Sequence, residues 1–269
     1  MPAVPVNGTE LYYEHAGAGH NLLFIHGMCG HAGVWQDQVR RLSPRFRCTA
    51  YDRRGHTRSP LGEITERTVE LHADDAAGLI RALDLAPCLL VASSGGARVG
   101  LDVVRRYPEL LSGAVLSEPP VFALDPEGAQ AMIAELKPTI GQAMDAGGPR
   151  AAVDAFFEYM CPGLWKTLDE PRKDTYRDNH PELLGDLQMP PYQITREDLN
   201  VIQVRCCIIR GAESLPVLRN IAAILAQEIP RALFVEFQGS GHVTYAEQPE
   251  RFAQTVEDFA NRLGVLPAG

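Results

Sequence analysis

The sequence predicts an α/β fold in which helices cover both faces of a mostly parallel sheet. Three observations support this prediction. Short apolar runs of strand length alternate with segments of helical periodicity through the first 118 residues. The connections between them are short, as in βα units. The alternation stops after residue 118 and resumes near residue 200, so a segment of different character interrupts the sheet.

The alternating parts of the chain are expected to supply the strands and their covering helices. The expected strands are 9–16, 21–25, 47–51, 89–92, 113–116, 204–209 and 232–237. The expected helices are 32–42, 66–83, a helix from the turn at residue 94 to about residue 107, 215–228 and about 250–263. In parallel sheets of this kind, ligands bind at the carboxyl ends of the strands.

The interrupting segment, residues 119–199, is predicted to be a helical lid inserted into a core of residues 1–118 and 200–269. Half of the 20 prolines lie between residues 119 and 191, and no strand pattern stands out there. A long excursion beside the ligand-binding edge is usually functional. Its aromatic residues either line an apolar pocket or pack the lid onto the core; they are Phe122, Phe156, Phe157, Tyr159, Trp165, Tyr176 and Tyr192. Phe157 and Trp165 are the predicted substrate-binding residues.

The composition excludes several classes of protein. A formal net charge of −9 argues against nucleic acid or an anionic membrane as the main partner. No apolar run is long enough to cross a bilayer, and the N-terminus lacks the pattern of a signal peptide. The six cysteines form no Cys-x-x-Cys pair, which favours reduced thiols in a cytoplasmic protein without a metal site or disulfides.

A serine at a sharp turn between strand and helix is the predicted nucleophile. In Ala92-Ser93-Ser94-Gly95-Gly96, small residues lie two positions on either side of Ser94, as a strained nucleophile elbow requires. Ser93 would instead have the bulky Val91 on one side. A phosphate-binding turn is the alternative, but the Gly-Lys-Ser/Thr and Gly-x-Gly-x-x-Gly patterns are both missing.

Of two loops that follow predicted strands, one is predicted to take part in catalysis and the other to have a structural role. His26-Gly27-Met28 ends a buried strand, and the amides of Met28 and Gly95 are predicted to form an oxyanion hole, with His26 as a structural residue. The polar loop 52–59 is predicted to be a surface turn with a structural role.

Three chemically suitable residues follow strands in the order Ser94, Glu118, His242. They would lie at one edge of the sheet, and this is the chain order of one known triad architecture. A neutral imidazole accepts the serine proton, and a carboxylate orients the ring and stabilises its charged form.

With these motifs, the chain resembles the α/β-hydrolase superfamily over essentially its whole length. The resemblance is carried by His26-Gly27-Met28, the stretch 51–59, the serine turn, and Gly241-His242 followed by Glu247-x-Pro249-Glu250. It implies an eight-stranded sheet, a helical cap after strand six, no cofactor, and hydrolysis of esters, thioesters or lactones.

The sequence departs from the family pattern at two places. Thr57 replaces a glycine of the usual Arg-Gly-x-Gly-x-Ser loop, which affects turn geometry. The usual acid position after strand seven holds Ser214, so the acid is either the adjacent Glu213 or Glu118 after strand six. Glu118 is favoured, because the Ser-Gly-Gly-Ala turn combined with Glu-Pro-Pro is similar to the fungal zearalenone lactonases.

The resulting expectation is a serine hydrolase that cleaves a small apolar ester or lactone through a covalent acyl-enzyme. A lyase, perhydrolase or acyl transferase would use the same triad, and a non-catalytic ligand-binding protein is the alternative from another class. The substrate and the oligomeric state, a homodimer included, are left open by the sequence.

Overall fold

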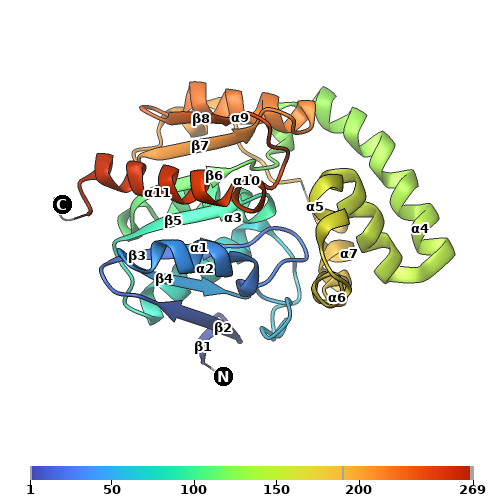
Figure 1. Cartoon of the computed structure of the whole chain (residues 1–269), viewed down its shortest axis with the longest axis horizontal. Coiled ribbons are helices and arrows are strands. Elements are labelled where there is room, and N and C mark those ends of the chain that lie inside the picture. The colour runs from blue at the N-terminus through green and yellow to red at the C-terminus, as the bar shows by residue number, and fades with distance from the viewer. Residues whose placement is uncertain (1, 190, 267–269) are drawn as a thin grey trace.

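The computed structural model describes residues 2–189 and 191–266 and contains one eight-stranded sheet (Figure 1). The strand order is β1-β2-β4-β3-β5-β6-β7-β8. The pairs β1–β2 and β2–β4 are antiparallel and all others are parallel. The strands are β1 (Ala3–Val6), β2 (Thr9–Ala16), β3 (His20–Ile25), β4 (Phe46–Tyr51), β5 (Cys88–Ser93), β6 (Leu111–Ser117), β7 (Cys206–Gly211) and β8 (Leu233–Phe237).

Helices cover both faces of the sheet, as predicted. One face packs against α1 (Gln36–Leu42) and α11 (Pro249–Leu263), and the other against α2 (Val69–Ala82), α3 (Gly95–Arg106) and α9 (Pro216–Glu228). Alternate residues of the central strands enter the two cores: Leu22 and Phe24 point to the first, Leu23 and Ile25 to the second. Burial on both faces explains why these strands are continuous apolar runs.

Helices fill the interval between β6 and β7, on one side of the sheet (Figure 1). We call residues 119–199 the lid segment. Its helices are η3 (Phe122–Leu124), α4 (Pro126–Met160), α5 (Pro162–Thr167), α6 (Glu170–Asp178) and α7 (His180–Gln188), and α8 (Arg196–Asn200) lies across its end. Gly148, at φ 75°, breaks α4 into two helices, and Pro149 begins the second. Residue 190 of the lid segment and residues 1 and 267–269 of the predicted core lie outside the described residues.

The structure adds elements to those expected and corrects one expectation. The short strand β1 was not predicted because Pro5 interrupts its pattern. The short helices η2 (Pro108–Leu110) and α10 (Thr244–Glu247) are also additional, whereas the helix expected at 32–42 begins as the short helix η1 (Ala32–Trp35) and continues as α1.

The loop 52–59 is largely buried, so its prediction as a surface turn was wrong. Asp52, Arg53, Arg54 and His56 are each at most 1% exposed. The charges of Arg54 and Asp52 are paired internally: Arg54 donates two hydrogen bonds of 2.8 Å to Asp75, and Asp52 accepts from the Arg58 guanidinium at 2.7 and 2.9 Å. Buried charges that are fully paired in this way are tolerated, and composition alone does not distinguish them from solvated ones.

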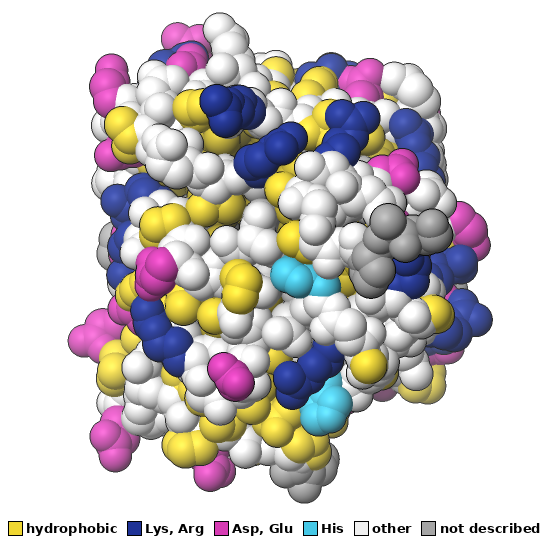
Figure 2. Space-filling model, turned by 90° about the vertical axis from the view of Figure 1, so that its left-hand side faces the viewer, with side chains coloured by type: hydrophobic (Ala, Val, Ile, Leu, Met, Phe, Trp, Pro, Cys, Tyr) yellow, Lys and Arg dark blue, Asp and Glu magenta, His cyan; other side chains and the backbone are white. Residues whose placement is uncertain are grey.

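The face that lies away from α4–α7 carries basic and acidic side chains interspersed with one another (Figure 2). Among the described residues, none of the helices combines the length and the apolar character needed to cross a membrane.

Candidate active site

Ser94 lies at the sharp turn between β5 and α3, in a conformation that non-glycine residues rarely adopt. Its φ and ψ are 54° and −129°. The chain passes very close to the end of β3 at this point. A Cβ atom built on Gly96 would lie 2.4 Å from the His26 carbonyl oxygen and 2.5 Å from that of Ile25. The turn therefore requires glycine two positions after Ser94, as the sequence pattern indicated.

We expect Gly96→Ala to destabilise the fold by about 3 kcal/mol, because the added methyl group meets rigid backbone rather than a side chain that can move. Gly95→Ala is the matched control, since a Cβ there would meet no atom outside its own helix closer than the Met28 nitrogen at 3.6 Å. Urea unfolding of both variants measures the difference. Equal midpoints for the two would contradict the steric argument.

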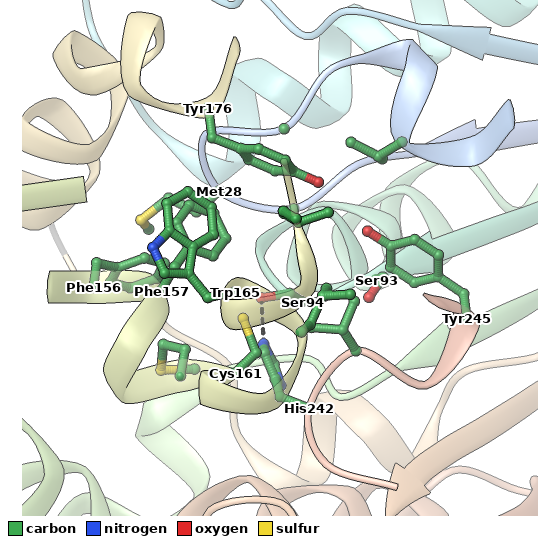
Figure 3. A pocket seen from close by; sticks show the side chains of 17 residues that line it. Met28, Ser93, Ser94, Phe156, Phe157, Cys161, Trp165, Tyr176, His242 and Tyr245 are labelled. Atoms are coloured by element: carbon green, nitrogen blue, oxygen red, sulfur yellow. Dashed lines mark hydrogen bonds between the residues drawn. The ribbon is translucent and has the colours of Figure 1, made fainter. Parts of the chain in front are cut away.

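Ser94, His242 and Glu118 form one hydrogen-bonded chain (Figure 3 shows its first link). The Ser94 Oγ lies 2.8 Å from His242 Nε2, and His242 Nδ1 lies 3.1 Å from Glu118 Oε2. His242 is 5% exposed and Glu118 is fully buried. Because the carboxylate can only accept, Nδ1 carries a proton and Nε2 is free to accept the serine proton.

The backbone and the end of β7 fix the Glu118 carboxylate. Glu118 itself has a left-handed φ of 53°. Its Oε1 accepts a hydrogen bond of 2.8 Å from the Gly211 amide, and its Oε2 accepts from the Ser214 hydroxyl as well as from His242. Glu213, the other candidate acid, is exposed, and its side chain has no hydrogen-bond partner among the described residues.

Two backbone amides are available beside the Ser94 hydroxyl. Within the described part of the chain, neither the Met28 nor the Gly95 amide donates a hydrogen bond to the protein. Both residues lie at the turns that meet Ser94: Gly95 begins α3, and Met28 lines the same pocket as Ser94. Free amides at such a position are suited to bind a negatively charged oxygen.

The peptide between Gly27 and Met28 is held from its carbonyl side. The Gly27 oxygen accepts from His26 Nδ1 at 2.8 Å, from the Gly30 amide at 3.3 Å and from Arg53 Nη2 at 3.4 Å. His26 Nε2 accepts from the Arg53 amide at 2.9 Å, which sets the tautomer of the ring. Burial holds the pKa of His26 well below its usual value, so the ring stays neutral. A fixed carbonyl directs the Met28 N–H, which is trans to it, the opposite way.

Aromatic side chains of the lid segment cover the serine (Figure 3). Phe157 and Trp165 stack with ring centroids 4.6 Å apart, and Tyr176 meets both rings edge-on. The space between lid and serine is narrow, with about 40 Å³ open to the centre of a water molecule. Cys161 also lines it, but burial raises the pKa of this thiol to about 12, so the thiol stays protonated.

The structure brings together the residues nominated for the triad and the substrate pocket, and Gly95 directly follows Ser94 at the start of α3. Ser94, Met28, Phe157, Trp165 and His242 line one pocket, and Glu118 lies behind His242. Sequence reasoning missed the role of Ser214 as a hydrogen-bond donor to Glu118. The signal was present, because Ser214 stands where the family usually has its acid.

Comparison with known proteins gives a consistent result. A family model described as the alpha/beta hydrolase family matches residues 22–255. An uncharacterized hydrolase of Bacillus subtilis, YraK, is 35% identical over 120 residues, which cover 44% of each chain. A putative carbamate hydrolase of Pantoea ananatis, RutD, is 24% identical over 270 residues and 96% of each chain.

Solved structures show the same fold. The enol-lactonase from Burkholderia xenovorans superimposes with a TM-score of 0.78 at 23% sequence identity. The match covers 97% of this chain and 100% of that one.

Proposed function

Because the chain belongs to the alpha/beta hydrolase family, we propose that it is a serine hydrolase that cleaves carboxylic esters or lactones with Ser94, His242 and Glu118 as its triad. The observation that carries the proposal is the continuous chain of hydrogen bonds from Ser94 Oγ through His242 to the buried Glu118 carboxylate. The proposed steps use protein groups and water only.

In the proposed reaction, Ser94 Oγ attacks the carbonyl carbon while His242 Nε2 takes its proton. Glu118 stabilises the resulting imidazolium from the Nδ1 side. The negative oxygen of the tetrahedral intermediate accepts hydrogen bonds from the Met28 and Gly95 amides, each of which lowers the barrier by about 3 kcal/mol. His242 then protonates the leaving alcohol. Water, activated by the same imidazole, hydrolyses the acyl-enzyme.

The proposed substrate is a small ester or lactone with an apolar acyl group. The aromatic side chains over Ser94 support this, because they offer apolar surface and exclude water from the acyl-enzyme. The structural likeness to an enol-lactonase agrees with a lactone as one form of the substrate. The resemblance to the zearalenone lactonases stays a prediction.

We further propose that residues 119–199 act as the lid of this site. The helices of the lid segment supply the wall of the pocket opposite Ser94. Since the closed space is narrow, an ester must displace lid side chains to enter.

A series of p-nitrophenyl esters with acyl groups from acetyl to octanoyl and phenylacetyl tests the substrate assignment. We expect kcat/KM to rise with the apolar size of the acyl group. We expect Phe157→Ala to lower kcat/KM for the larger esters by about tenfold, because the acyl chain loses its apolar contact with the Phe157 ring. The value for the acetyl ester should be nearly unchanged. Phe234→Ala, an exposed aromatic residue on β8, is the control. A parent enzyme that hydrolyses none of the esters would overturn the proposed function.

A further inference from the structure

One side chain of the lid segment is bonded deep inside the core, beside the candidate oxyanion hole. Asn179 lies at the corner between α6 and α7 and is 3% exposed. Its Nδ2 donates hydrogen bonds to the carbonyl oxygens of Cys29 at 2.9 Å and Gly30 at 3.0 Å. These two residues directly follow Met28, which lines the same pocket as Ser94.

The segment that Asn179 holds has an unfavourable backbone conformation. Cys29 has a φ of 53°, a left-handed value that is unfavourable for a residue with a Cβ atom. The Cys29 side chain adds a weak bond from its Sγ to the Asn179 carbonyl oxygen at 3.6 Å. The Gly30 amide donates a hydrogen bond to the Gly27 oxygen, and this bond fixes the peptide that carries the Met28 amide. The Asn179 bonds are therefore one residue from the group that would bind the oxyanion.

The same amide group also holds a second strained loop. Asn179 Oδ1 accepts a hydrogen bond of 2.8 Å from the Thr57 amide, and Thr57 has a φ of 47°. Thr57 stands where the family pattern has a glycine, which would adopt this conformation without a penalty. Asn179 thus connects three segments: the corner of the lid segment, the Met28 turn and the loop after β4.

We propose that Asn179 is a positioning residue that couples the seated lid segment to the oxyanion hole. When the α6–α7 corner is in place, its carboxamide holds the Cys29 and Gly30 carbonyls and so keeps the Met28 amide aimed at the Ser94 site. When the corner lifts, the loop loses these bonds and the oxyanion hole loses its geometry. This inference rests on the proposed function, because it concerns an oxygen that becomes negative only during acyl transfer.

The test compares Asn179→Ala with Tyr192→Phe in the full-length chain. Tyr192→Phe also removes a buried hydrogen bond between lid segment and core, from the Tyr192 hydroxyl to Asp102 at 2.9 Å, but this bond does not reach the Met28 turn. For each variant, kcat and KM are measured on one activated ester. Inhibition by a trifluoromethyl ketone, whose serine adduct carries an oxyanion, is measured beside it, with urea unfolding as the folding control.

We expect Asn179→Ala to lower kcat by about tenfold to a hundredfold with a much smaller change in KM, and to weaken the trifluoromethyl ketone by a similar factor. Tyr192→Phe should change kcat and the inhibition by the trifluoromethyl ketone by less than about threefold, even where its urea unfolding midpoint falls as much as that of Asn179→Ala. Equal effects in the two variants, or a loss confined to KM, would overturn the inference.

If Asn179→Ala folds poorly, the conservative variant Asn179→Asp tests the same inference. Asn179→Asp keeps the acceptor for Thr57 but puts a carboxylate oxygen where the amide donated to Cys29 and Gly30. The same selective loss of kcat is expected, and normal kcat in a folded Asn179→Asp enzyme would also overturn the inference. Failure of the proposed function is recognised separately, since the parent would then neither hydrolyse the ester nor bind the ketone.

Discussion

Replacing Ser94 by alanine is expected to lower kcat for an activated ester by about four orders of magnitude or more, to the residual level that binding and an oxyanion hole alone provide. The physical reason is the loss of the proposed attacking atom: Ser94 Oγ lies 2.8 Å from the imidazole nitrogen that would accept its proton. The measurement is steady-state hydrolysis of a p-nitrophenyl ester, combined with labelling by a fluorophosphonate. The label should be absent from the variant.

The neighbouring serine provides a matched control. Ser93 lines the same pocket and is 2% exposed, yet no hydrogen bond joins it to His242 in the described structure. Ser93→Ala should therefore keep its activity within about threefold of the parent and should be labelled normally. If Ser93→Ala lost the label and Ser94→Ala retained it, the assignment of the nucleophile would be reversed.

The sequence could nominate the serine and the turn around it because local sterics limit which residues such a turn accepts. A turn at this angle accepts only small residues two positions before and after the serine, so Ala92 and Gly96 mark it directly. The alternation of strands and helices likewise follows from local hydrophobic patterns and places the loop residues at one edge of the sheet. His242 could be found because it stands in a glycine-flanked loop at that same edge.

What the sequence could not predict depends on contacts between residues far apart in the chain. The loop 52–59 is as polar as a surface turn, and only the pairing of Arg54 with Asp75 reveals that it is buried. Asn179 is one asparagine among several polar residues of a helical segment, and nothing local marks its bonds to Cys29 and Gly30 across about 150 residues. Fold class follows from periodicity, but such long-range polar contacts require the assembled structure.

Replacing the triad acid is also expected to have a large effect on kcat, and it distinguishes Glu118 from Glu213 as that acid. We expect Glu118→Gln to lower kcat by about three to four orders of magnitude, because the amide neither stabilises the imidazolium nor enforces the productive tautomer. Gln preserves the size of the buried side chain, and its oxygen can still accept from the Gly211 amide. Glu213→Gln should leave kcat within about twofold, as is usual for an exposed residue without partners. Hydrolysis of one short-chain ester and one macrocyclic lactone by the three proteins gives the measurement.

The geometry explains why this comparison separates the two acids. Glu118 Oε2 lies 3.1 Å from His242 Nδ1 and also accepts a hydrogen bond from Ser214, which stands at the family's usual acid position. In the proposed triad, Glu118 at the end of β6 takes the place, at His242 Nδ1, of the acid that the family usually has after β7. If this exchange is correct, a Ser214→Asp substitution in the Glu118→Gln protein should restore part of the lost kcat, since it returns an acid to the position after β7. Loss of activity in Glu213→Gln, with Glu118→Gln active, would instead place the acid after β7 in the present enzyme and remove the basis for the exchange.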